Sequence, residues 1–153
     1  PLDEKTPHAS FYEAMGYYLD LFKMGRDQTN AKNASKAFKK FIAAYPNNPA
    51  VPFAKEKITE LKERLAKSMY RIAAFYYGID AFGAAIGRVD DLLLQHPGSR
   101  LVPGALLLKG RAYVQEEAFK KAKKVFEYVS SKYPGTPEGD SAKNELKKLE
   151  SRY

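Results

Sequence analysis

The chain has 153 residues, a formal net charge of +8 and no cysteine, a length that suits one domain or a fragment of a longer helical array. The absence of cysteine excludes disulfides, thiolate chemistry and cysteine-based metal sites. Leu, Ala, Lys and Tyr dominate and β-branched residues are scarce, which predicts an all-α fold. The apolar runs are too short to span a bilayer. The positive charge favours acidic partners, but most lysines fall on the polar faces of predicted helices, where solvation accounts for them.

The first predicted helix runs from about Pro7 to Met24 and carries an apolar face. Thr6 can cap its start, and Pro7 suits the first helical position because the missing N–H has no partner there. A polar loop is expected over Gly25 to Asn30, followed by a second helix from about Ala31 to Tyr45. The abrupt start of the sequence suggests that a leader or an upstream segment has been removed.

One long helix is predicted from about Val51 to Tyr77. This stretch contains no Gly or Pro after Pro52, and its apolar residues recur every three or four positions. At about 1.5 Å per residue such a helix is roughly 40 Å long, so it would belong to two successive repeats and fix their orientation. Gly78 is expected to end it, and a further helix is predicted over Ala81 to His96.

The stretch from Leu106 to Pro134 has the pattern of a tetratricopeptide hairpin. Its matching residues stand at offsets 0, 3, 12, 16 and 24 from the glycine: Gly110, Tyr113, Ala122, Phe126 and Pro134. The glycine allows two helices to cross closely, the aromatic, Ala and Phe positions pack the hairpin, and the proline ends the second helix.

The return helix of this hairpin recurs three times at offsets 0, 4, 7, 8, 11 and 12. The three copies are Ala34, Phe38, Phe41, Ile42, Tyr45, Pro46; Ala85, Val89, Leu92, Leu93, His96, Pro97; and Ala122, Phe126, Val129, Ser130, Tyr133, Pro134. Two residues after each proline comes a residue that can cap the next helix: Asn48, Ser99 and Thr136. We therefore predict a single domain of tetratricopeptide-like hairpins stacked in a right-handed solenoid. The hairpins span about 7–46, 51–97 and 101–134, and a capping helix covers 137–152.

No arrangement of residues in the sequence indicates catalysis. Asp90-Asp91 and Glu116-Glu117 are adjacent pairs, so the two carboxylates of each pair diverge by about 100° on a helix. Phosphate-binding glycine loops and the common metalloprotease and hydrolase motifs are absent from the sequence. His96 takes a packing position that Tyr holds in the other repeats. We expect a protein that is not an enzyme and has no cofactor or metal.

Arg88 is the strongest candidate for a binding residue. It replaces a small apolar residue of the other repeats at the edge of the buried stripe, about 40° from Leu92. One interpretation is an internal ion pair with Asp90 or Asp91, and the other is a forked donor for a partner's carboxylate.

Two glycines on the same predicted helix also need explanation. Gly83 and Gly87 lie on its opposite face near Leu94, and each costs about 1 kcal/mol relative to Ala in a helix interior. Either a neighbouring helix packs closely there, or the bare backbone forms a shallow groove for a partner. The predicted partner-binding set is Arg88, Asp91, Gly87 and Leu94.

The sequence resembles the C-terminal half of the BamD family, also called YfiO/ComL, from about Phe11 to Tyr133. The segment leading from L-K-x-R-L-A-K through x-x-A-x-(Y/F)-Y to A-x-x-R-V is the most specific part of the likeness. The matching residues are Tyr17-Tyr18-Leu19, Arg26-Asp27, Ala34 to Phe38, Tyr45-Pro46, Leu61 to Lys67, Tyr76-Tyr77, Ala84-Ala85 and Arg88-Val89.

The resemblance implies a non-catalytic scaffold of the machinery that inserts β-barrels into the outer membrane. Family members lie at the periplasmic face of that membrane, where a lipidated N-terminal cysteine anchors them; because the sequence has no cysteine, we expect a truncated chain. The implied partners are the last POTRA domain of BamA, reached through Arg88, other assembly lipoproteins and unfolded outer-membrane proteins.

Two other functions are consistent with a helical repeat. A tetratricopeptide adaptor would hold an extended peptide in its concave groove, lined by Asn, Arg and Lys from the first helix of each repeat. A nucleic-acid binder would need a continuous basic stripe with interleaved aromatics, whereas the Tyr and Phe residues here fall mostly on apolar faces, so no nucleic-acid partner is expected.

Overall fold

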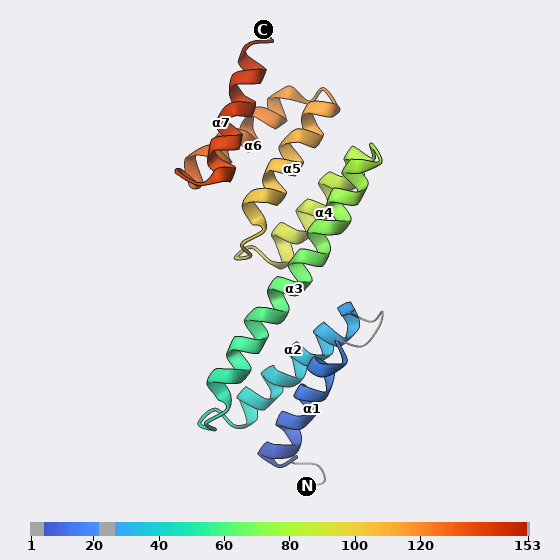
Figure 1. Cartoon of the computed structure of the whole chain (residues 1–153), viewed down its shortest axis with the longest axis vertical. Coiled ribbons are helices and arrows are strands. Elements are labelled where there is room, and N and C mark those ends of the chain that lie inside the picture. The colour runs from blue at the N-terminus through green and yellow to red at the C-terminus, as the bar shows by residue number, and fades with distance from the viewer. Residues whose placement is uncertain (1–4, 22–26, 153) are drawn as a thin grey trace. The chain divides into compact units, whose positions relative to one another are not determined.

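The computed structural model describes residues 5–21 and 27–152, and all secondary structure in these ranges is helical (Figure 1). The helices are α1 (Pro7–Asp20), α2 (Asp27–Ala44), α3 (Val51–Gly78), α4 (Phe82–Gln95), α5 (Val102–Gln115), α6 (Phe119–Lys132) and α7 (Pro137–Glu150). The all-α prediction is confirmed, as is the uninterrupted helix predicted from Val51 to Tyr77. That helix forms because the stretch is free of helix breakers after its first turn.

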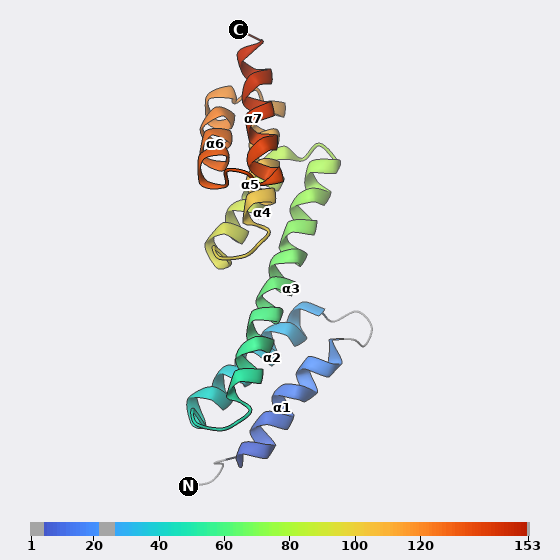
Figure 2. The same ribbon diagram turned by 60° about the vertical axis from the view of Figure 1, so that its left-hand side comes forward.

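The chain divides into two compact units, Pro1–Leu65 and Ala66–Tyr153, and α3 contributes residues to both. In the first unit α1 and α2 form a hairpin against the first half of α3 (Figure 2). The largest fully buried side chains there are Phe38, Phe41 and Leu61, and small residues at Ala14, Ala34 and Ala54 allow the helices to approach closely.

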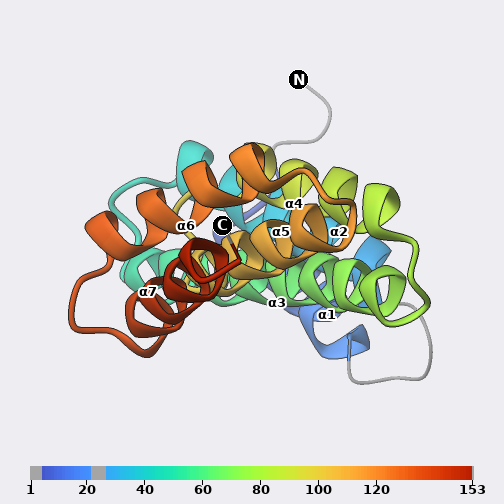
Figure 3. The same cartoon turned by 90° about the horizontal axis from the view of Figure 1, so that it is seen from above.

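The second unit contains the rest of α3 and the helices from α4 to α7. Each of α4, α5 and α6 packs on the helix that follows it, and α7 also contacts α5 (Figure 3). The core is formed by Val89 and Leu92 of α4, Phe126 and Val129 of α6, and the buried side of α5. These are the positions at which the repeat pattern placed its apolar residues.

Several helix ends follow the expected capping chemistry. The Thr6 hydroxyl accepts the Ala9 N–H at 3.2 Å, and the Thr136 hydroxyl accepts the Gly139 N–H at 3.1 Å. Asn48 and Ser99 do not cap the following helices directly. Their side chains accept N–H groups two residues ahead and so stabilise the turns that precede α3 and α5.

The first hairpin departs from the predicted boundaries. The helix predicted to reach Met24 ends at Asp20, and Met24 lies outside the described residues. The loop predicted up to Asn30 is wrong for residues 27–30, which are already helical. The first turn of α2 is polar, so the spacing of apolar residues gives no indication that it is helical. In the structure the Asn30 amide donates to the Asp20 carbonyl at 3.4 Å.

The turns after α3 and α5 both use a non-glycine residue in the left-handed region. Asp80 has φ 62° and Glu117 has φ 59°. In each turn the next residue donates its N–H to a carbonyl five residues earlier, at 2.9 Å. α3 does end at Gly78, as predicted, but the left-handed position that a glycine would favour is two residues later.

Candidate docking surface

The outer face of α4 brings the four predicted binding residues to the surface of the second unit. Gly87, Asp91 and Leu94 stand at offsets 0, 4 and 7, so they share one stripe of the helix, and Arg88 borders it. All four are exposed, and the Leu94 side chain is 82% exposed. We call this stripe with Arg88 the α4 face.

Arg88 does not form the internal ion pair that was one interpretation of the sequence. Its guanidinium carbon lies 5.8 Å from the centre of the Tyr76 ring on α3, a cation–π distance. Asp90 is engaged elsewhere, because Lys109 of α5 binds its carboxylate at 2.5 Å. The ring therefore contacts the guanidinium itself, while the Arg88 side chain stays exposed to a partner.

The close helix packing proposed for the two glycines is wrong for Gly87. A Cβ built at Gly87 meets no atom within 4 Å, and one at Gly83 meets only a carboxylate oxygen of Glu116 at 3.4 Å. Both glycines are exposed. The bare backbone therefore forms part of the accessible α4 face and does not serve a helix crossing.

The sequence reasoning missed an apolar edge beside Arg88. Phe75 and Ile79, one turn apart at the end of α3, are 62% and 57% exposed, and the Phe75 ring packs edge-on against Tyr76 at 5.7 Å. We call Phe75, Tyr76 and Ile79 the α3 edge. A signal was available, because three consecutive aromatics at 75–77 are spread by about 100° each and cannot all face one seam.

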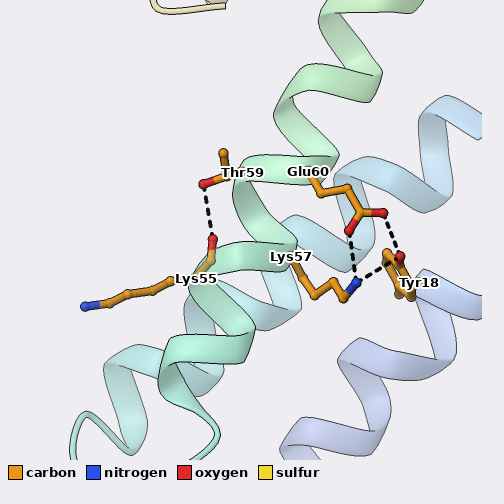
Figure 4. Close-up of polar contacts among 5 residues, drawn as sticks. All are labelled: Tyr18, Lys55, Lys57, Thr59 and Glu60. Carbon is orange, nitrogen blue, oxygen red and sulfur yellow. Dashed lines mark hydrogen bonds and ion pairs between the residues drawn. The ribbon is translucent and has the colours of Figure 1, made fainter.

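A second polar cluster lies in the first unit and joins α1 to α3 (Figure 4). The Tyr18 hydroxyl donates to Glu60 at 2.6 Å, and the Lys57 ammonium lies 3.0 Å from the other Glu60 oxygen and 3.2 Å from the Tyr18 oxygen. The hydrogen bond from Tyr18, followed by that from Lys57, lowers the pKa of Glu60. The hydrogen bond to Glu60, followed by that to Tyr18, raises the pKa of Lys57. The three groups satisfy one another, which indicates that they stabilise the fold.

Neither a metal-binding cluster nor a membrane-spanning helix occurs in the part of the chain that the structure describes. Among residues 5–21 and 27–152, no group of three or more His, Cys, Asp or Glu side chains could hold a metal ion. Within the same ranges, none of the helices has the length and apolar content needed to cross a bilayer.

The packing of successive helices and the close crossing at Gly110, where an added Cβ would lie 2.5 Å from the Phe126 ring, define a helical-repeat protein of the tetratricopeptide class. A family model described as "YfiO: Outer membrane lipoprotein" matches residues 6–115, which is well over half of the chain. The chain belongs to this family, and the resemblance drawn from the sequence is confirmed. The match includes α1 to α5 and therefore the whole α4 face.

The chain is also similar to curated relatives, each named outer membrane protein assembly factor BamD. It is 34% identical over 99 residues to that of Vibrio cholerae (63% of this chain, 41% of the relative). It is 29% identical over 135 residues to that of Pasteurella multocida (80% and 52%) and 25% identical over 135 residues to that of Caulobacter vibrioides (88% and 44%). The chain spans about half the length of these relatives or less.

Proposed function

We propose that the chain acts as a non-catalytic scaffold in the machinery that assembles β-barrel proteins in the outer membrane, at the periplasmic face of that membrane. Its relatives are named as assembly factors of this process. In this proposal the chain binds the POTRA region of BamA through the α4 face and the α3 edge. Other assembly lipoproteins and unfolded outer-membrane proteins are further proposed partners.

The observation that carries the proposal is an exposed arginine held against an exposed apolar edge. Arginine and aromatic residues dominate the binding energy of protein interfaces, because a planar guanidinium and a ring both lose little entropy when they bind. Arg88 supplies the forked donor, while Phe75 and Ile79 supply apolar area that water would otherwise cover. A carboxylate beside an apolar patch on the POTRA domain would complement both.

The test is a calorimetric titration of the 153-residue chain with a purified POTRA array of BamA. Arg88→Ala removes the donor without touching the core, so we expect an affinity at least about tenfold weaker, as for loss of a charge-assisted hydrogen bond. Arg152→Ala, at the exposed end of the chain after α7, makes the same change of charge and is expected to bind like the wild type. Equal affinity of the Arg88 variant and the wild type would overturn the proposal.

A further inference from the structure

A groove in the first unit, between α1 and α2, is separate from the α4 face and has a different chemistry. It has a volume of about 680 Å³, within the range of roughly 300–1,000 Å³ that ligand sites occupy. Ser10, Glu13 and Tyr17 line it from α1, and Asn33, Lys36 and Lys40 line it from α2. Each set recurs at offsets of 0, 3 and 7, so each forms one stripe along its helix.

The positive charge of the groove is not compensated within it. Lys5 also lines the groove, and it pairs with Glu13 at 2.5 Å. Lys36 and Lys40 are exposed, stand one turn apart on α2 and have no carboxylate partner among the residues that the structure describes. Like charges at this spacing on a helix repel each other. An anionic ligand would remove that repulsion.

We propose that this groove binds an extended acidic protein segment with carboxylates at alternate positions. Lys36 and Lys40 are separated by a rise of about 6 Å along α2. Alternate residues of an extended chain are about 6.6 Å apart and point to the same side, so two carboxylates at that spacing would meet the two ammonium groups. The Asn33 amide and the Tyr17 hydroxyl can bond the peptide backbone.

The composition of the groove disfavours a nucleic acid. A nucleic acid would bring phosphates along its whole length, where Glu13 would repel them. Among the residues that the structure describes, no arginine, which recognises phosphate in a fork, lines the groove. The donors come mainly from the second helix of the hairpin, α2. A peptide-binding tetratricopeptide adaptor was expected to place such donors on the first helix of each repeat.

The experiment uses a fluorescent decapeptide in which Glu alternates with Ser, titrated by anisotropy with the 153-residue chain at low salt. The wild type is expected to bind it saturably, and the same peptide with Gln in place of Glu is expected not to bind. The double variant Lys36→Glu and Lys40→Glu reverses both charges, so its affinity is expected to fall at least about tenfold.

The matched control is the double variant Lys32→Glu and Lys39→Glu. These lysines are exposed on the same helix but do not line the groove, so the change in net charge is identical. We expect a loss of less than about twofold, reflecting only long-range attraction. Equal losses in the two double variants would overturn the proposal, as would equally tight binding of the Gln peptide.

Competition separates the ligand classes. An unlabelled Glu–Ser decapeptide is expected to displace the probe. If a single-stranded oligonucleotide or vesicles containing anionic lipid displaced it more effectively, the assignment to protein segments would be refuted. The inference is independent of docking at the α4 face. The Lys36→Glu and Lys40→Glu variant is expected to keep its affinity for the POTRA array, and thermal unfolding checks that both double variants remain folded.

Discussion

A Cβ built at Gly110 of α5 lies 2.5 Å from the Cε1 atom of the Phe126 ring on α6. The Phe126 side chain is fully buried and packed on all sides, so the ring has no space to withdraw. We expect Gly110→Ala to lower the free energy of unfolding by about 1–3 kcal/mol, as for overpacking in a tight core. Urea denaturation of the two proteins measures the difference.

Gly104, in the same helix, is the matched control for this prediction. Its Cβ would meet Tyr70 at 3.9 Å, an ordinary contact. Gly104→Ala should leave stability unchanged or raise it by up to about 1 kcal/mol, because alanine is the better helix former. Similar destabilisation by both substitutions would contradict the crossing geometry.

Replacing Glu117 with glycine is expected to stabilise the folded protein. The Glu117 φ of 59° carries a steric cost for any residue with a Cβ. Glu117→Gly should therefore raise the free energy of unfolding by about 0.5–1 kcal/mol in a thermal or urea melt. Glu116, next to it, has φ −84°. Glu116→Gly should therefore lower the free energy of unfolding, because glycine loses more conformational entropy on folding. A destabilised Glu117→Gly protein would rule out strain at this turn.

The contribution of Glu60 to stability should depend on pH. Its folded-state pKa is lowered below 4.5 by the bonds from Tyr18 and Lys57. The stabilisation is therefore present above about pH 4.5 and is lost as the pH falls through the folded-state pKa. Because Glu60 is 47% exposed, solvent limits the effect of Glu60→Gln at pH 7 to less than about 1 kcal/mol.

Urea denaturation at pH 7 and pH 3 tests this prediction. The difference between wild type and Glu60→Gln should shrink at the lower pH, because pH 3 lies below the ordinary pKa of the carboxyl, where the lowered pKa contributes less to stability. The pKa of Lys57 is raised above 10.5, so this lysine stays charged at both pH values and does not contribute to the change. Glu56→Gln, an exposed change on the same helix, is the control substitution for this comparison.

Tyr76 should influence partner binding through Arg88 without providing the charge itself. A cation–π contact at an exposed site is worth about 0.5–1 kcal/mol, so Tyr76→Leu is expected to weaken the POTRA titration by about two- to fivefold. Tyr76→Phe keeps the ring beneath the guanidinium and should bind like the wild type. If the Phe variant lost as much affinity as the Leu variant, the hydroxyl and not the ring would be responsible.

Much of the fold follows from local pattern. The spacing of Phe38, Phe41, Val89, Leu92 and Phe126 identified the buried faces of α2, α4 and α6, and all five are buried in the structure. Thr6 and Thr136 marked two helix starts because a side-chain oxygen at that position satisfies a free N–H within a few residues. Both signals are local, so they can be read along the chain without knowledge of distant contacts.

The predicted site illustrates what local pattern leaves open. The sequence selected Arg88 and Gly87 as candidate binding residues of one helix, but it could not choose between an ion pair and a free donor for Arg88, or between close packing and an open surface for Gly87. That choice depends on Tyr76, which is 12 positions away on another helix, and on Lys109, which forms an ion pair with Asp90. The basic groove of the first unit likewise requires two helices to be placed side by side.

The sequence by itself therefore determined that this chain is a helical repeat, because apolar periodicity, glycine at a crossing and proline at helix ends are properties of single segments. The tertiary structure alone decided which charges are compensated. Lys109 and Arg111 of α5 have carboxylate partners on α4 and α7, whereas no carboxylate among the described residues pairs with Lys36 or Lys40. An ion pair depends on a distance of a few ångströms between helices, which the order of residues along one helix does not specify.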